Sequence, residues 1–224
     1  MTHISFMFRL LSPLVLLGPL CFGQYQFAIN DASEKYNAEI TVEECTNDGC
    51  RGKGSVVLFD KSGNKKQTFL SPDLVFYFKK DFKPSKEIMT VTQDMFRDEP
   101  LYFDDFNFDG TQDVSVRNGN GGNYGSASYD IYVFNSTKMQ FVPSAELTEL
   151  ASGYQGMFGI DEKNKRLTTF ARSGQTYYTN TYEVVPGKGV VLVSEKIEDH
   201  TTERAKIIIK KKVNNKWVVK KTTE

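Results

Sequence analysis

The sequence predicts an all-β protein built from short antiparallel hairpins. Hydrophobic residues make up 39% of the 224 residues and include 17 Phe and 11 Tyr, a content that favours strands. Apolar and polar side chains alternate with period two in several segments, such as residues 38–43. Turn-forming residues separate these segments at spacings of about ten residues, which is typical of a sandwich, a barrel or a propeller.

The first 23 residues read as a secretory signal peptide. Arg9 precedes an apolar run that is too short for a membrane span of about 20 residues. Cys21 and Gly23 are small residues at the −3 and −1 positions of a cut before Gln24. The alternative is a lipoprotein anchored through Cys21, although Leu20 is larger than the residue usual before such a cysteine. The mature part, residues 24–224, is expected to be a single exported all-β domain without a membrane span.

Two cysteines remain in the mature part, Cys45 and Cys50, with turn formers between them. In an oxidising compartment such a pair most simply forms a disulfide that staples a turn between two strands. The next hairpin is expected around residues 61–64, between strands at 55–59 and 67–70. Residues 74–78 are suited to a short buried strand.

Later strands follow the same pattern. They are expected at residues 101–103, 114–116, 129–134, 166–171, 177–185, 190–195, 206–212 and 217–221. Asn214 and Asn215 form the last turn, and residues 145–151 are the one helical segment. From Arg204 to Lys221 there are eight basic residues and no acidic one, which fits either lysine protection of an exposed edge or a docking surface for an acidic partner.

The most specific local signal is a calcium loop at residues 105–113. Side-chain oxygens stand at its positions 1, 3, 5 and 9, in Asp105, Asn107, Asp109 and Asp113, and Thr111 would add a backbone carbonyl. Gly110 stands at position 6, where such loops turn sharply. Position 12 is Val116 rather than the glutamate of an EF-hand, and the flanks read as strands. We therefore expect a strand-loop-strand Ca²⁺ site with a structural role, pinned to the core by Phe106 and Phe108; the alternative is an acidic turn without metal.

Signals for other chemistry are sparse. The balanced charge, 28 basic and 28 acidic residues, provides no field that would attract nucleic acid. The mature part holds one histidine, His200, and lacks the common nucleophile, metalloprotease and phosphate-loop motifs. The Gly-rich segment 118–126 does not open a helix and is expected to be a long, mobile turn that completes the calcium site or contacts a partner. These features favour a binding protein over an enzyme.

The order of motifs resembles a family of calcium-containing, β-propeller-like bacterial periplasmic proteins related to FG-GAP repeats. The acidic loop, the Gly/Asn-rich segment and the strand 128–134 carry the resemblance, together with residues 161–167 and 182–185. It covers about half of the chain, residues 98–195. The best-understood relatives are immunity proteins, so the resemblance implies a propeller-like fold and inhibition of a lysozyme-like peptidoglycan hydrolase.

Residues 173–177 read S-G-x-x-Y and resemble the motif that periplasmic lysozyme inhibitors insert into the enzyme cleft. Ser173 and Gly174 would form the inserted turn, and Tyr177 would supply rigid contact area with a polar tip. The plain alternative is a hairpin turn followed by a strand residue. We therefore expect a periplasmic Ca²⁺-binding inhibitor; a calcium-dependent adhesion or carbohydrate-binding module and a glycoside hydrolase with an unrecognised carboxylate pair are the alternatives.

Overall fold

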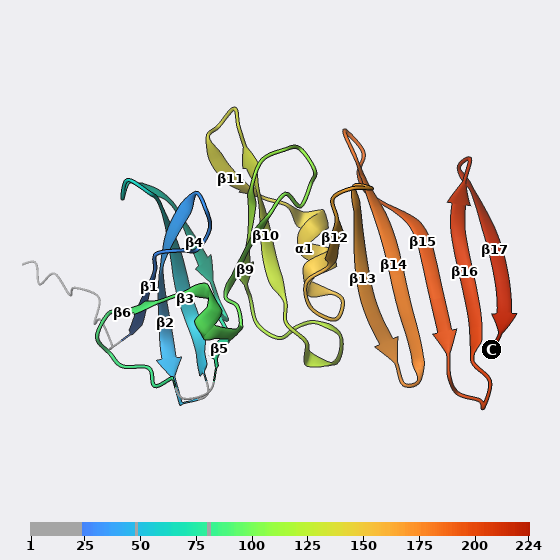
Figure 1. Ribbon diagram of the computed structural model, residues 1–224, viewed down its shortest axis with the longest axis horizontal. Coiled ribbons are helices and arrows are strands. Elements are labelled where there is room, and N and C mark those ends of the chain that lie inside the picture. Colours follow the sequence, from blue (N-terminus) through green and yellow to red (C-terminus); the bar gives the residue numbers. More distant parts are fainter. Residues whose placement is uncertain (1–23, 48, 80–81) are drawn as a thin grey trace, which may run out of the picture.

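A computed structural model describes residues 24–47, 49–79 and 82–224. The predicted signal peptide, residues 1–23, lies outside the described residues. The described chain is mostly β-strand with one short α-helix, which confirms the predicted all-β class. Its strands form three sheets, here called A, B and C, which lie in a row along the long axis of the molecule (Figure 1).

Sheet A holds the N-terminal strands, in the order β6-β1-β2-β3-β5-β7, with β4 paired to β3. Its strands are β1 (Tyr25–Ile29), β2 (Tyr36–Cys45), β3 (Gly49–Asp60), β4 (Lys65–Ser71), β5 (Phe76–Phe78), β6 (Met89–Val91) and β7 (Phe96–Asp98). The turn predicted at residues 61–64 is confirmed, with Gly63 at a φ of 84° and the Asp60 carboxylate accepting the N–H groups of Ser62 and Asn64. The segment 74–78 is buried as expected, but only its last three residues form a strand.

Sheet B is a four-stranded meander in the middle of the row, in the order β11-β10-β9-β8. Its strands are β8 (Leu101–Asp104), β9 (Asp113–Arg117), β10 (Tyr129–Asn135) and β11 (Gln140–Pro143). The helix α1 (Ala145–Ser152) follows, where it was predicted. Two short 3₁₀ turns, at Gln93–Met95 and Asn123–Gly125, were not predicted.

Sheet C is an open six-stranded meander that runs in sequence order to the end of the chain. Its strands are β12 (Gly159–Asp161), β13 (Arg166–Ser173), β14 (Thr176–Val185), β15 (Gly189–Asp199), β16 (Lys206–Val213) and β17 (Lys216–Thr223). The predicted turn between the last two is confirmed: Asn214 and Asn215 have φ values of 48° and 60°, as a two-residue type I′ hairpin requires.

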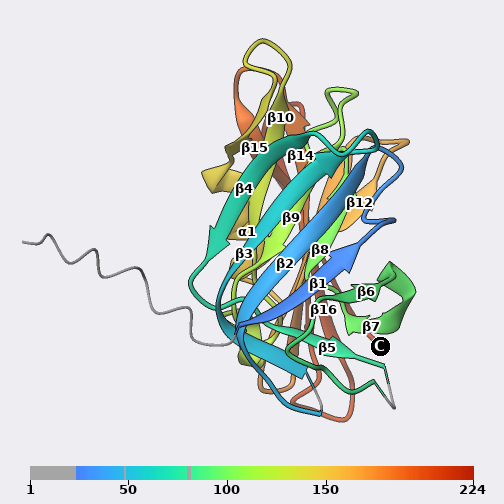
Figure 2. The same cartoon turned by 90° about the vertical axis from the view of Figure 1, so that its left-hand side faces the viewer.

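Sheet B separates two hydrophobic cores. One core lies against sheet A, where Phe27, Ile40 and Phe76 belong to the same buried cluster as Val114 and Val116 of β9. The other lies toward α1 and sheet C. Figure 2, turned to face the end that holds sheet A, shows β1 to β4 in front of β9 and β10. All five residues of β9 are therefore buried: its two valines face sheet A, and Asp113, Ser115 and Arg117 point to the opposite face.

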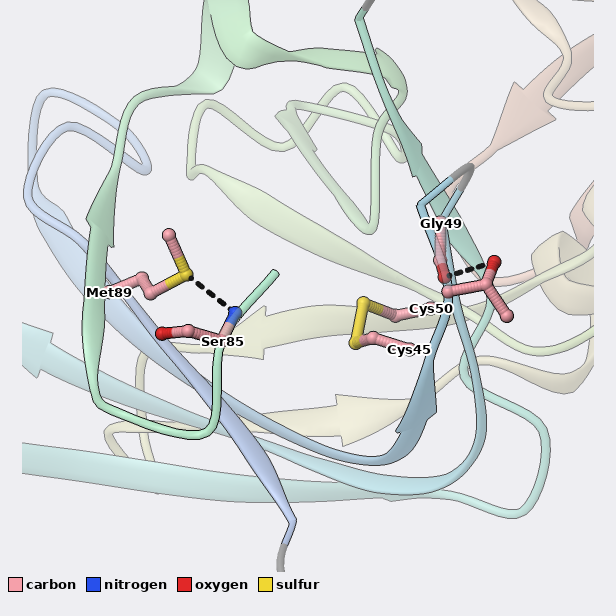
Figure 3. The surroundings of a disulfide bond; sticks show 6 residues. Cys45, Gly49, Cys50, Ser85 and Met89 are labelled. Carbon is pink, nitrogen blue, oxygen red and sulfur yellow. Dashed lines mark hydrogen bonds between the residues drawn. A yellow bond between two sulfur atoms is a disulfide. The ribbon is translucent and has the colours of Figure 1, made fainter. Parts of the chain in front are cut away.

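The predicted disulfide between Cys45 and Cys50 is present. It links the last residue of β2 to the second residue of β3, two positions that are directly paired across the hairpin (Figure 3). Cys50 is 2% exposed and Cys45 packs against the same core. The bond therefore closes the end of the longest hairpin of sheet A.

Candidate functional site

The acidic loop joins β8 to β9, so the strand-loop-strand arrangement predicted for residues 105–113 is confirmed. The Asp105 carboxylate accepts the N–H groups of Asp109 (3.0 Å) and Gly110 (2.8 Å). The Asn107 amide oxygen accepts the N–H of Asp109 at 3.1 Å, and the Asp109 carboxylate accepts that of Thr111 at 2.8 Å. Positive φ values at Phe108 (58°) and Gly110 (88°) turn the chain inward, which explains the glycine at the sixth position.

Asp113 ends this loop and is fully buried. Its two carboxylate oxygens accept the backbone N–H groups of Phe134 (2.8 Å) and Phe106 (3.0 Å). Burial raises the pKa of Asp113 to about 7, and the nearby carboxylates of Asp109 and Asp105 also raise it, against the lowering effect of the two hydrogen bonds. Asp113 thus ties the loop to sheet B. Because it is fully buried, its carboxylate cannot exchange a proton with a substrate.

The donor types of the loop fit calcium, which prefers carboxylate and carbonyl oxygens. In the described part of the chain, however, no three Asp, Glu, His or Cys side chains are grouped so that they could hold a metal ion. The carboxylates of Asp105 and Asp109 instead bind N–H groups of their own loop, and Glu162 and Lys165 line the shallow pocket above them. Calcium binding therefore stays a prediction.

The aromatic anchors of the loop were predicted to reach the core. Phe106 does so: it is 1% exposed and its ring meets that of Phe158 edge to face, with centroids 5.7 Å apart. Phe108 is only partly buried and packs against the rim of the same core.

The S-G-x-x-Y stretch forms the tip of the β13–β14 hairpin. Ser173 ends β13, residues 174 and 175 make the turn, and Gly174 has a positive φ of 58°, which a two-residue hairpin turn favours at this position. Ser173 pairs with Thr176, and Arg172 pairs with Tyr177. Because neighbouring residues of a strand point to opposite faces, Ser173 and Tyr177 lie on opposite faces of the hairpin tip. Both are exposed, Tyr177 by 43%.

The Gly-rich segment supports this tip. The Tyr124 hydroxyl accepts the N–H of Gly174 at 2.9 Å, and the Asn123 amide oxygen accepts the N–H of Arg172 at 3.0 Å. The Arg172 guanidinium lies over the Tyr124 ring, 4.5 Å from its centroid. The segment is therefore fixed by contacts with the hairpin rather than being a free turn, and it adds a second exposed aromatic residue, since Tyr124 is 61% exposed.

A buried arginine anchors the other side of the same segment. Arg117, 3% exposed at the end of β9, donates to the Gly119 carbonyl (3.0 Å), the Tyr129 hydroxyl (3.1 Å) and the Asn120 amide oxygen (2.5 Å). These bonds satisfy a charge that would otherwise be costly to bury. They also fix where the chain leaves β9 toward Tyr124.

A shallow pocket lies beside the tip on the face of Tyr177. The His200 ring packs edge to face on the Tyr177 ring, with centroids 5.6 Å apart. The backbone N–H of His200 donates to the Gln175 carbonyl at 3.1 Å. The pocket is lined by Gln155, Phe170, Gln175, Tyr177, Glu198 and His200. Phe170 is 48% exposed. The face thus combines exposed aromatic area with polar groups, as protein-binding surfaces do.

The structure brings together some of the predicted site residues and separates others. The Gly-rich segment and the S-G-x-x-Y turn are in contact, as an interface made of several loops requires. The acidic loop and the Gly-rich segment, in contrast, lie at opposite ends of β9, because one precedes the strand and the other follows it (Figure 1). The Gly-rich segment therefore does not complete the acidic loop. The supporting roles of Tyr124, Arg172 and Arg117 were not predicted from the sequence.

Comparison with known proteins gives one structural likeness to report. The chain is similar to the solved structure of a Xanthomonas type IV secretion system related protein, with a TM-score of 0.61 and 20% sequence identity. The match covers 84% of this chain and 90% of that chain. The two proteins share a fold. No protein-family profile matches the chain, and no curated protein sequence matches it.

Among the described residues, no helix has both the length and the apolar character needed to cross a membrane. The disulfide is compatible with an exported or periplasmic protein.

Proposed function

We propose that this chain is an exported β-protein that binds and inhibits a lysozyme-like peptidoglycan hydrolase. The observation that carries the proposal is the braced hairpin tip at Ser173 and Gly174. Its turn is held by the Tyr124 hydroxyl, and Tyr177 stands exposed beside it. Rigid, exposed aromatic residues are the usual anchors of tight protein interfaces, because they bury a large area and lose little conformational freedom.

The hairpin tip suits insertion into a cleft. Ser173 and Tyr177 lie on its opposite faces, so an inserted tip would contact both walls of the cleft at once. The Ser173 hydroxyl makes no hydrogen bond within the described residues and is free to donate to a carboxylate of the target. Glycoside hydrolases carry a pair of catalytic carboxylates in such a cleft. The Tyr177 ring would pack on the other wall.

The structural neighbour and the disulfide bear on the compartment in which the protein acts. The structural neighbour is named for a type IV secretion system, and the disulfide suits an oxidising compartment. Both support the proposal that the chain is an exported, periplasmic inhibitor of a hydrolase. The propeller-like arrangement of the hairpins stays a prediction, since the described strands form sheets of seven, four and six strands.

We further infer that the acidic loop binds Ca²⁺ in a structural role. Asp105, Asn107 and Asp109 would supply side-chain oxygens and Thr111 its carbonyl. Asp113 was also predicted as a ligand, but its two carboxylate oxygens accept the N–H groups of Phe106 and Phe134, so in this proposal it joins the loop to the core. The expected result is that calcium raises the melting temperature of the metal-free protein, because binding adds about 2.7 kcal/mol to the free energy of unfolding when free calcium is a hundredfold above the dissociation constant. Asp109→Ala removes one of these oxygen ligands and is expected to reduce this response. Identical melting of the native chain with chelator and with calcium would contradict the site.

The inhibitory proposal is tested by peptidoglycan lysis with a lysozyme-like hydrolase in the presence of the purified protein. Tyr177→Ala is expected to weaken inhibition by about 2 kcal/mol, or about thirtyfold in the dissociation constant, without lowering the melting temperature. Leu70→Ala is the matched control, because Leu70 is also a large exposed side chain, 72% exposed, but lies on β4. No inhibition by the native protein, or equal inhibition by the Tyr177 variant, would overturn the proposal.

A further inference from the structure

The C-terminal strand β17 is an exposed sheet edge. It pairs with β16 on one side, and all eight of its residues are exposed (Figure 1, right). Its pairing runs from Lys206 opposite Thr223 to Val213 opposite Lys216 without a register shift, so no bulge interrupts it. The terminal strands β6, β7, β8, β11 and β12 of the three sheets have only three or four residues each. β4, which pairs only with β3, has seven residues, and its pairing carries a register shift. A long, regular edge presents unpaired backbone groups that can accept another strand.

The side chains of this hairpin alternate between apolar and cationic. Six successive cross-strand pairs each join one lysine to one apolar residue: Lys216 with Val213, Trp217 with Lys212, Val218 with Lys211, Val219 with Lys210, Lys220 with Ile209 and Lys221 with Ile208. Trp217, Val218 and Val219 are 46%, 54% and 51% exposed. Both faces of the hairpin are therefore of mixed character, so neither offers a continuous apolar surface for flat packing. The free edge, in contrast, has a defined order: one lysine, three apolar residues, then two lysines.

The charge at this edge is uncompensated. Lys210 forms an ion pair with Glu195 in β15, and Lys206 lies near Asp199. Within the described residues Lys216, Lys220 and Lys221 have no carboxylate at ion-pair distance. Like charges placed directly opposite each other are destabilising, so pairing with a second copy in register would set these lysines against each other. An acidic strand would instead neutralise them.

We propose that β17 binds an extended segment of another polypeptide as an added β-strand. The segment carries acidic residues opposite Lys216, Lys220 and Lys221 and apolar residues opposite Trp217, Val218 and Val219. Main-chain hydrogen bonds along the edge supply affinity, and the order of charges supplies specificity and register. This surface is separate from the hairpin tip at Ser173, so the inference stands independently of the inhibitory function.

The test uses the whole mature chain and the capped peptide TTEEVIVE, which places its glutamates opposite Lys221, Lys220 and Lys216 in antiparallel pairing. Binding is measured by calorimetry at low and at physiological salt. The combined variant Lys216→Glu, Lys220→Glu and Lys221→Glu is expected to weaken binding at least about tenfold and to bind the basic peptide TTKKVIVK instead. The matched control reverses three exposed lysines elsewhere, Lys53, Lys65 and Lys138, with the same change in net charge.

A second arm separates strand pairing from simple charge attraction. The same acidic peptide with alternate backbone nitrogens methylated, made in both possible phases, keeps its charge and loses the main-chain donors of one edge. At least one phase is expected to lose binding, because strand addition needs those donors. Undiminished binding of both methylated peptides, equal weakening in the control variant, or no binding of TTEEVIVE overturns the proposal. Sedimentation that shows a dimer lost in the β17 variant also overturns it, because a second copy would then be the occupant.

Discussion

Tyr124 is expected to act as the brace of the hairpin tip, and replacing it tests this directly. Tyr124→Phe removes the hydroxyl that accepts the Gly174 N–H but keeps the ring under Arg172. At an exposed position such a hydrogen bond contributes about 1 kcal/mol. Tyr124→Leu also removes the cation–π contact, which adds about 0.5–1 kcal/mol at an exposed site. The two variants therefore separate the hydroxyl from the ring.

The assay is amide hydrogen exchange at Gly174, measured by NMR. A loss of about 1 kcal/mol of local stability speeds exchange about fivefold, and the Leu variant should reach ten- to thirtyfold. Tyr177→Phe is the control, because the Tyr177 hydroxyl makes no hydrogen bond within the described residues. Unchanged protection of the Gly174 amide in Tyr124→Phe would refute the brace. The backbone conformation also supports the role of Tyr124 as a brace. Its φ of 57° is strained for a non-glycine residue, so its side-chain contacts must offset that strain.

Two further perturbations concern the supports of the fold. Asp113→Asn leaves one side-chain oxygen in place of two, so either Phe106 or Phe134 loses the acceptor of its buried N–H. We expect the free energy of unfolding, measured in urea, to fall by about 1–3 kcal/mol with or without calcium. The same substitution at the exposed Asp161 is the control and should change this free energy little. An unshifted midpoint would show that the buried carboxylate is dispensable. Cys45→Ser with Cys50→Ser is expected to cost about 2 kcal/mol, since the bridge closes a small loop, and to lower the melting temperature by about 4–8 °C. If adding a reductant to the native chain does not reproduce this loss, the stabilisation does not come from the bridge.

The parts of the fold that could be predicted are those whose cause is local. Asn214-Asn215 adopts the positive φ values that a type I′ turn demands, and Gly63 does the same in the turn after β3. The strands of sheet C follow from alternating residues between such turns, and the short helix from the apolar spacing of Leu147 and Leu150. The disulfide followed from an even, closely spaced pair of cysteines.

The parts that could not be predicted depend on contacts between distant segments. The parallel pairing of β1 with β6, which sets Phe27 beside Met89, has no local signal. Tyr124 and Gly174 are 50 positions apart, and nothing in the Gly-rich segment indicates which hairpin it meets. Arg117 was hidden for a related reason: a charged residue in a strand pattern is normally taken as exposed, whereas here three acceptors from the following loop and β10 satisfy it in the core.

The polar face of β9 connects the acidic loop with the segment that supports the hairpin tip, so it determines whether a change in the loop can alter the tip. Asp113 at the start of this strand holds the acidic loop, Arg117 at its end holds the Gly-rich segment, and Ser115 between them contacts the backbone of Tyr102. All three are buried, so a change at one end reaches the other only through a strand packed on both faces. Such a strand transmits little structural change from one end to the other unless it unfolds, because close-packed interiors have few alternative arrangements. The proposed calcium ion should therefore stabilise the whole domain, and it should leave the affinity of the hairpin tip for the proposed hydrolase unchanged as long as the protein stays folded.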